Sequence, residues 1–154
     1  MKFTETQIYI RVKKHLLNTG WEVIAGQPPS GSDHLPVIEI KDHLVTEKGS
    51  LGAFKPDLVA WKANVLLIIE LKPLFEYSDV KKLNATLESP ERQKALWEEI
   101  STRNLRTRQG DALAIYRGNT NIVGGLGYGG ELKSIKGFIH FNVQQNSIRE
   151  VDLS

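Results

Sequence analysis

Two acidic residues and a lysine have the types and the spacing of a metal-dependent site. Pro56-Asp57 is followed, after twelve intervening residues, by Glu70-Leu71-Lys72. Carboxylates are the ligands that hard divalent cations prefer, and a lysine beside them can stabilise negative charge on a phosphate. Whether this chemistry is available depends on the elements that hold the three side chains.

The segments around the motif predict a β-hairpin. Residues 57–61 and 65–72 read as strands, and the second is nearly all Val, Leu and Ile, which is typical of a strand buried on both faces. A tight turn between Ala63 and Asn64 pairs Asp57 with Glu70 across the strands. Opposed side chains lie about 5 Å apart on one face, and Lys72 shares that face because alternate residues of a strand do. We expect Pro73 to end the strand, since proline cannot donate to the ladder.

Two carboxylates this close repel each other unless a cation lies between them. Oxygen ligands suit Mg²⁺, with Mn²⁺ as a substitute, and such an ion can polarise a phosphoryl oxygen and activate a water for in-line attack. Lys72 would stabilise the developing charge or orient the water. The alternative is a surface ion pair at a strand end, in which Lys72 only neutralises Glu70.

Pro56-Asp57…Glu70-Leu71-Lys72 resembles the signature of the PD-(D/E)xK nuclease superfamily. The order of elements over residues 4–118 also resembles the restriction-endonuclease-like αβββαβ core of that family. The resemblance implies an α/β domain with a mixed central β-sheet flanked by helices. It further implies that Asp57, Glu70 and the backbone carbonyl of Leu71 bind the metal, with Lys72 as the catalytic lysine.

Many members of the family add an acid from the first helix, and Glu5 is the candidate here, with Glu22 as the fallback. On a helical wheel Glu5 falls near Val12 and Leu16, in the centre of the apolar stripe, so a metal site would give its carboxylate a partner. The alternative is that Glu5 lies in the first helical turn, where an acid meets the helix dipole favourably and reaches solvent.

Basic residues after the motif are candidates for contacts to a nucleic-acid backbone. The resemblance favours Lys81 and Lys82, because the helix after the Glu-x-Lys strand often borders the active site in that family. Arg103, Arg106 and Arg108 cluster near the end of the next predicted helix and could follow phosphates. The alternative for the arginines is a solvated helix face whose cations stabilise the C-terminus.

Other patterns are interpreted as structural. Glu39-Ile40-Lys41 repeats the acid-x-lysine spacing, but its upstream Asp33 is too close in sequence to lie on an antiparallel partner strand. Residues 125–130 match GxGxxG but precede a predicted strand rather than a helix, so we expect a loop or hairpin and no dinucleotide cofactor. The four histidines are scattered without zinc-binding spacing.

The remaining elements follow from apolar periodicity, caps and turn residues. We expect helices at 4–19, 78–87 and 89–102, strands at 21–25, 37–41, 112–116, 135–143 and 148–153, and a glycine loop at 124–130.

The composition is that of one globular domain over residues 1–154, with 40% apolar and 25% charged residues. There is no cysteine, no signal-peptide pattern and no apolar run of about 20 residues, so we expect a cytoplasmic protein that does not enter membranes. The net charge of +2 neither demands nor excludes a nucleic-acid partner.

The expected function is therefore a Mg²⁺-dependent deoxyribonuclease, in particular an endonuclease. One alternative is a Holliday-junction-resolvase-like or repair nuclease acting on branched or damaged DNA, because the short chain leaves little room for a sequence-reading domain. Another is a non-cleaving, nucleic-acid-binding subunit of a larger complex. Small nucleases of the family often pair two subunits, so a homodimer is also expected.

Overall fold

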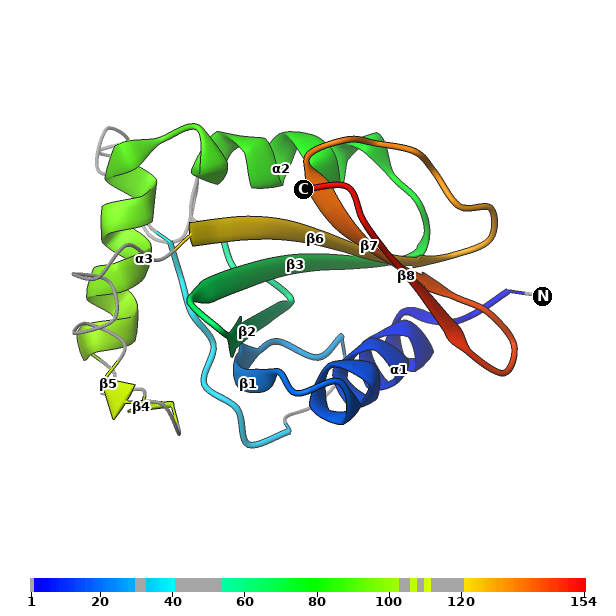
Figure 1. Ribbon diagram of the computed structural model, residues 1–154, viewed down its shortest axis with the longest axis horizontal. Coiled ribbons are helices and arrows are strands. Elements are labelled where there is room, and N and C mark those ends of the chain that lie inside the picture. Colours follow the sequence, from blue (N-terminus) through cyan, green and yellow to red (C-terminus); the bar gives the residue numbers. More distant parts are fainter. Residues whose placement is uncertain (1, 30–32, 41–53, 103–105, 108–109, 112–120) are drawn as a thin grey trace.

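The computed structural model describes residues 2–29, 33–40, 54–102, 106–107, 110–111 and 121–154. Six of its strands form a mixed sheet in the order β1-β2-β3-β6-β7-β8, and β4 and β5 form a separate pair. Helix α1 lies on one face of the sheet, α2 lies on the other, and α3 packs against α2 (Figure 1). The predicted α/β class with a mixed sheet flanked by helices is confirmed. The elements are α1 (Glu5–Asn18), β1 (Glu22–Gly26), β2 (Leu58–Lys62), β3 (Val65–Leu74), α2 (Tyr77–Leu87), α3 (Pro90–Thr102), β4 (Arg106–Thr107), β5 (Gly110–Asp111), β6 (Asn121–Gly129), β7 (Phe138–Val143) and β8 (Ile148–Asp152).

The predicted hairpin is confirmed with its register. β2 and β3 pair antiparallel from Lys62 opposite Val65 to Leu58 opposite Ile69. The two turn residues, Ala63 and Asn64, have φ angles of 48° and 64°. Positive φ at both central residues is the feature of the tight turns that match the twist of paired strands. The turn therefore fixes which residues of the two strands face each other.

The end of β3 differs from the prediction. The strand does not stop before Pro73 but continues to Leu74, and its parallel pairing with β6 shifts register between Lys72 and Leu74. Proline is tolerated at such an irregularity because no regular ladder bond depends on its missing N–H.

The glycine-rich segment is a strand and not the predicted loop. β6 pairs parallel with β3 on one side and with β7 on the other. A Cβ at Gly127 would lie 2.4 Å from Leu71 Cδ2, and one at Gly124 would lie 2.8 Å from the Phe138 ring. The glycines thus leave room for side chains that pack over the strand. The strand predicted at 112–116 lies outside the described residues, and β6 takes the place next to β3.

Helices α1 and α3 begin with side-chain caps, whereas α2 begins at Tyr77, one residue before the predicted start, and its N-cap residue Glu76 makes no side-chain cap hydrogen bond. Thr4 and Gln7 form a reciprocal capping box before α1, with the Gln7 N–H donating to Thr4 Oγ1 over 3.1 Å. The Ser89 hydroxyl oxygen accepts from the Arg92 N–H over 3.2 Å at the start of α3. Of the strand predicted at 37–41, the described residues contribute one isolated bridge, between Ile40 and Phe54. Among the described residues, no helix is long and apolar enough to cross a membrane.

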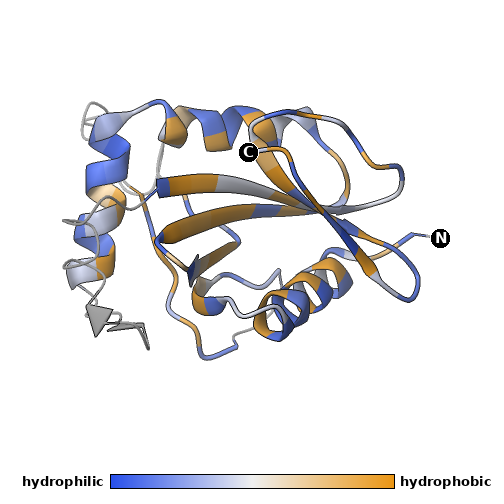
Figure 2. Cartoon of the chain, viewed as in Figure 1, coloured by the Kyte–Doolittle hydropathy of each residue, from blue (hydrophilic) through white to orange (hydrophobic). Residues whose placement is uncertain are grey.

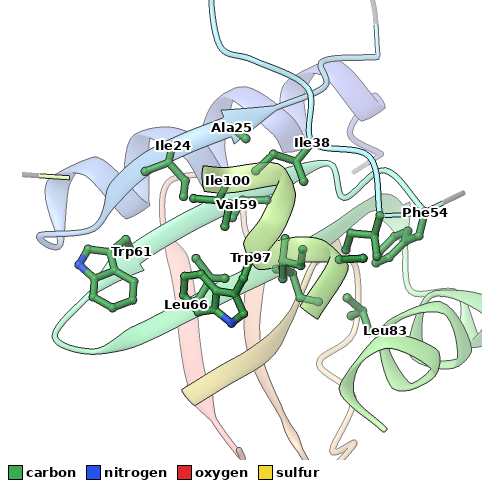
Figure 3. Close-up of a cluster of buried hydrophobic side chains, with 14 of the residues drawn as sticks. Ile24, Ala25, Ile38, Phe54, Val59, Trp61, Leu66, Leu83, Trp97 and Ile100 are labelled. Atoms are coloured by element: carbon green, nitrogen blue, oxygen red, sulfur yellow. The ribbon is translucent and has the colours of Figure 1, made fainter. Parts of the chain in front are cut away.

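Two apolar clusters occupy the two faces of the sheet. Alternate β3 residues enter opposite clusters: Leu66 and Ile68 pack beneath α2 and α3, whereas Leu67 and Ile69 pack against α1. Apolar residues run along β3, and apolar and polar residues alternate around α1 (Figure 2). Trp97 of α3 is 2% exposed within the first cluster, so it belongs to the core (Figure 3). By the same alternation, Glu70 and Lys72 belong to the face that α2 covers.

Candidate active site

Asp57 and Glu70 lie next to each other where the hairpin ladder ends. The Asp57 N–H donates to the Ile69 carbonyl over 3.1 Å, and the Leu71 N–H donates to Asp57 Oδ2 over 2.8 Å. The Asp57 carboxylate thus takes a place that a backbone carbonyl would occupy in a regular ladder. The carboxyl groups of Asp57 and Glu70 are within hydrogen-bonding reach of each other. The predicted convergence of the two acids is present, one position beyond the last regular pair.

The surroundings of Glu70 disfavour its negative charge. Its side chain is 5% exposed, and burial, the hydrogen bond with Asp57 and the charges of Asp57 and Asp79 raise its pKa to about 10, against a smaller opposing effect of Lys82. Without a cation, Glu70 therefore keeps its proton at neutral pH. A divalent cation that binds there must displace this proton and would supply the missing positive charge.

Lys72 is half-buried and stays charged. Burial lowers its pKa, but the charges of Asp79, Glu76, Glu5 and Asp57 outweigh this effect and raise the pKa overall. None of the ion pairs between described residues joins Lys72 to Glu70. The alternative interpretation, an ion pair between Lys72 and Glu70 at the strand end, is therefore not found among the described residues. Lys72 instead lies among several acids of the same site.

A polar pocket of about 230 Å³ opens beside Asp57 and Leu71. It is lined by residues of α1, of the segment after β1 and of the hairpin, namely Glu5, Tyr9, Gln27, Pro28, Pro29, Asp57 and Leu71. Glu5 is the first residue of α1, is exposed, and lines this pocket. Glu5 thus reaches solvent from the first helical turn, as the second interpretation expects, and its side chain also borders the pocket. Glu22 pairs with Trp61 at the far end of β1, away from Asp57, and is not part of the site.

Asp79 is a site residue that the sequence analysis missed. It is 3% exposed, and burial together with the charges of Asp57 and Glu76 raises its pKa to about 6, although Lys72 and Lys82 act in the opposite direction. The sequence predicts a helix over residues 78–87 with Ser78-Asp79 as its N-terminal cap, which gives Asp79 no role in the site. A signal was present, because Asp79, Leu83 and Thr86 recur at helical spacing on one buried stripe of α2.

Of the predicted nucleic-acid contacts, Lys82 is the one that the described structure brings to the site. Its charge acts on both Glu70 and Asp79. Lys81 is exposed on the same helix. Arg103 and Arg108 lie outside the described residues, and Arg106 is in β4, where only its backbone is described.

The donor set fits a magnesium ion in its usual protein setting. Among the described residues, no three His, Asp or Glu side chains are close enough together to hold a metal. Mg²⁺ needs no such cluster, because it commonly takes one or two carboxylates and completes its shell with water and substrate phosphate. Asp57 and Glu70 could provide the two carboxylates, and the Leu71 carbonyl would be a further oxygen from the same segment.

The residues interpreted as structural have structural partners. Asp33 accepts hydrogen bonds from the Tyr9 hydroxyl and from Lys13 Nζ, the latter over 3.0 Å, and so ties the segment after β1 to α1. His140 is fully buried in β7 and bonds through both ring nitrogens, to the Tyr128 hydroxyl and the Ile135 carbonyl, each over 2.7 Å. Lys41, of the second acid-x-lysine triplet, lies outside the described residues.

Comparison with known proteins adds no family to this picture. No protein-family model matches the chain, and no curated protein is significantly similar to it. A functional hypothesis for the chain must therefore come from the chemistry of Asp57, Glu70, Lys72 and the groups around them.

Proposed function

We propose that this chain is a Mg²⁺-dependent nuclease of the restriction-endonuclease-like type that hydrolyses phosphodiester bonds in DNA. The observation that carries the proposal is the buried carboxyl pair. Glu70 lies 5% exposed beside Asp57, where its negative charge is disfavoured, and Asp57 lines an open polar pocket. Carboxyl groups with strongly raised pKa values are concentrated at functional sites, and a bound cation would offset the repulsion between these two.

In this proposal Asp57, Glu70 and the Leu71 carbonyl hold the metal. When bound, Mg²⁺ supplies a positive charge that polarises the phosphoryl oxygen and lowers the pKa of a coordinated water. The water oxygen forms a bond to phosphorus, the bond from phosphorus to the leaving sugar oxygen breaks, and that oxygen takes up a proton. Lys72 stabilises the charge on the phosphoryl oxygens or orients the water. Glu5 contributes a further carboxylate from the wall of the pocket.

Lys82, with Lys81 beside it, is proposed to contact the DNA backbone. The site itself carries more acids than lysines, so a phosphate is repelled until the metal is present. We therefore expect productive DNA binding at this site to depend on a divalent cation as well as on the exposed lysines of α2.

A cleavage panel tests the proposal. The purified chain is incubated with plasmid, single-stranded and branched DNA in Mg²⁺, in Mn²⁺ and in chelator. We expect metal-dependent cleavage that Glu70→Gln abolishes and that Glu39→Gln, the matched change in the second acid-x-lysine triplet, leaves intact. A strong preference for branched DNA would support the resolvase alternative. Tight binding without cleavage under any metal would contradict the enzyme and support the non-cleaving subunit.

The proposal extends to a homodimer, because one such site cuts one strand and double-strand cleavage is simplest with two. Light scattering under cleavage conditions measures the assembly. A monomer that cuts both strands of a duplex would contradict this part of the proposal without affecting the chemistry at the site.

A further inference from the structure

Asp79, in the first turn of α2, has a buried carboxyl group at a position where an acid commonly caps the helix. Asp79 is the third helical residue after the N-cap residue Glu76, the position from which an acid often reaches back to the N-cap N–H. The Glu76 side chain makes no cap hydrogen bond, and the Asp79 side chain is buried, at 3% exposed. Among the described residues nothing donates a hydrogen bond to Asp79 Oδ1, which is fully buried. A buried carboxyl oxygen normally accepts a hydrogen bond, so a donor is expected near Asp79 Oδ1.

The packing of α2 directs this carboxyl toward the site. Asp79 belongs to the buried stripe that includes Val80 and Leu83, and α2 packs on β3 and β6 (Figure 1). Glu70 and Lys72 belong to the face of β3 that α2 covers. The acid on the helix and the lysine on the strand therefore approach each other across one packed layer.

Lys72 is the donor that this arrangement offers. Its ammonium carries three hydrogens on a flexible chain, and among the described residues no ion pair engages it. Of the acids whose charges act on Lys72, Asp79 has the largest effect, ahead of Glu76, Glu5 and Asp57. Lys82 also acts on Asp79, but it is exposed on the helix surface.

We propose that Asp79 is a positioning residue for Lys72. No ion pair joins these two described side chains as they stand, and rotation of the flexible lysine chain would let its ammonium donate to the unpartnered Asp79 Oδ1 and hold the charge beside Glu70. The catalytic consequence rests on the proposed nuclease function, whereas the coupling between the two side chains does not. A lysine fixed in this way keeps its charge beside the reacting phosphate instead of turning toward solvent. The contact with Asp79 should therefore raise the turnover rate rather than the affinity for DNA.

The kinetic test compares Asp79→Asn with Thr86→Val. Thr86 is a matched control because it is also buried on α2, with a hydroxyl that has no partner among the described residues. We expect Asp79→Asn to lower kcat by about tenfold or more with KM changed less than about twofold. Thr86→Val should leave kcat unchanged. Equal kcat values for Asp79→Asn and the wild type, or equal losses in both variants, would overturn the proposal.

A double-mutant cycle on stability tests the coupling without any need for activity. The urea midpoint is measured at pH 8 in chelator for Asp79→Asn and Thr86→Val, each in the wild-type and the Lys72→Met background. We expect Asp79→Asn to lower the midpoint more, or raise it less, when Lys72 is present, while Thr86→Val has the same effect in both backgrounds. An Asp79→Asn effect that does not depend on Lys72 would overturn the proposal, even if the chain proves to be a nuclease.

Discussion

Replacing Glu70 by glutamine should change how the stability of the metal-free protein depends on pH. The pKa of Glu70 rises from its ordinary 4.5 in the unfolded chain to about 10 in the folded one, chiefly through burial. Between these values the folded state holds a proton that the unfolded state has released. The free energy of unfolding therefore falls as the pH rises, and this loss is present throughout the range from about 4.5 to 10.

The size of the effect follows from the proton count. One extra proton in the folded state changes the free energy of unfolding by about 1.4 kcal/mol per pH unit. Raising the pH from about 6.5 to about 8.5 should thus destabilise the wild type by up to about 3 kcal/mol through the proton that the buried carboxyl pair holds. Asp79, with its pKa of about 6, adds little in this window because it is already largely ionised. Glu70→Gln cannot release the proton and should lack this part of the slope.

The assay is urea unfolding of the wild type and Glu70→Gln in chelator at the two pH values. Groups far from the site titrate alike in both proteins, so the difference between the two slopes reports Glu70 together with the acids that interact with it, Asp57 and Asp79. Adding Mg²⁺ should stabilise the wild type more at the higher pH, because the metal competes with the proton. Parallel pH dependences for the two proteins would refute the reasoning about the buried carboxyl pair.

Three further changes probe the hairpin, the glycine strand and the lysine of α2. Gly127→Ala should destabilise the fold by about 1–3 kcal/mol, measured by urea unfolding, because its Cβ would lie 2.4 Å from Leu71 Cδ2. Ala63→Gly should stabilise the fold by up to about 1 kcal/mol in the same assay, because it relieves a φ of 48°; any loss of stability would contradict this. Lys82→Gln should weaken DNA binding in Ca²⁺ and reduce the salt slope of binding by about 1, while Lys14→Gln on α1 should not.

The hairpin could be predicted from the sequence because its determinants are local. Two residues form the turn, and the period of two along each strand then decides that Glu70 and Lys72 share a face. The glycine-rich strand β6 could not be predicted in this way, because its glycines make room for side chains from distant segments of the chain. Gly127 makes room for Leu71, and Gly124 for Phe138, and neither neighbour is visible from the local composition of β6.

In the candidate site, too, some residues could be predicted from the sequence and others could not. Asp57, Glu70 and Lys72 could be found from their spacing, and Glu5 from its place at the start of the first helix. The burial of Asp79 depends on how α2 packs across β3, so its position after Ser78 alone indicated a cap. The buried stripe that Asp79 shares with Leu83 indicates burial, whereas the local preference of aspartate for helix starts indicates a cap.

The most direct test of the central claim is the rate of plasmid cleavage by the wild type and by Lys72→Met, each in Mg²⁺ and in chelator. The metal-dependent nuclease account predicts cleavage by the wild type in Mg²⁺, none in chelator, and a loss of about a hundredfold or more in Lys72→Met. Cleavage by Lys72→Met at the wild-type rate, or cleavage that persists in chelator, would contradict it.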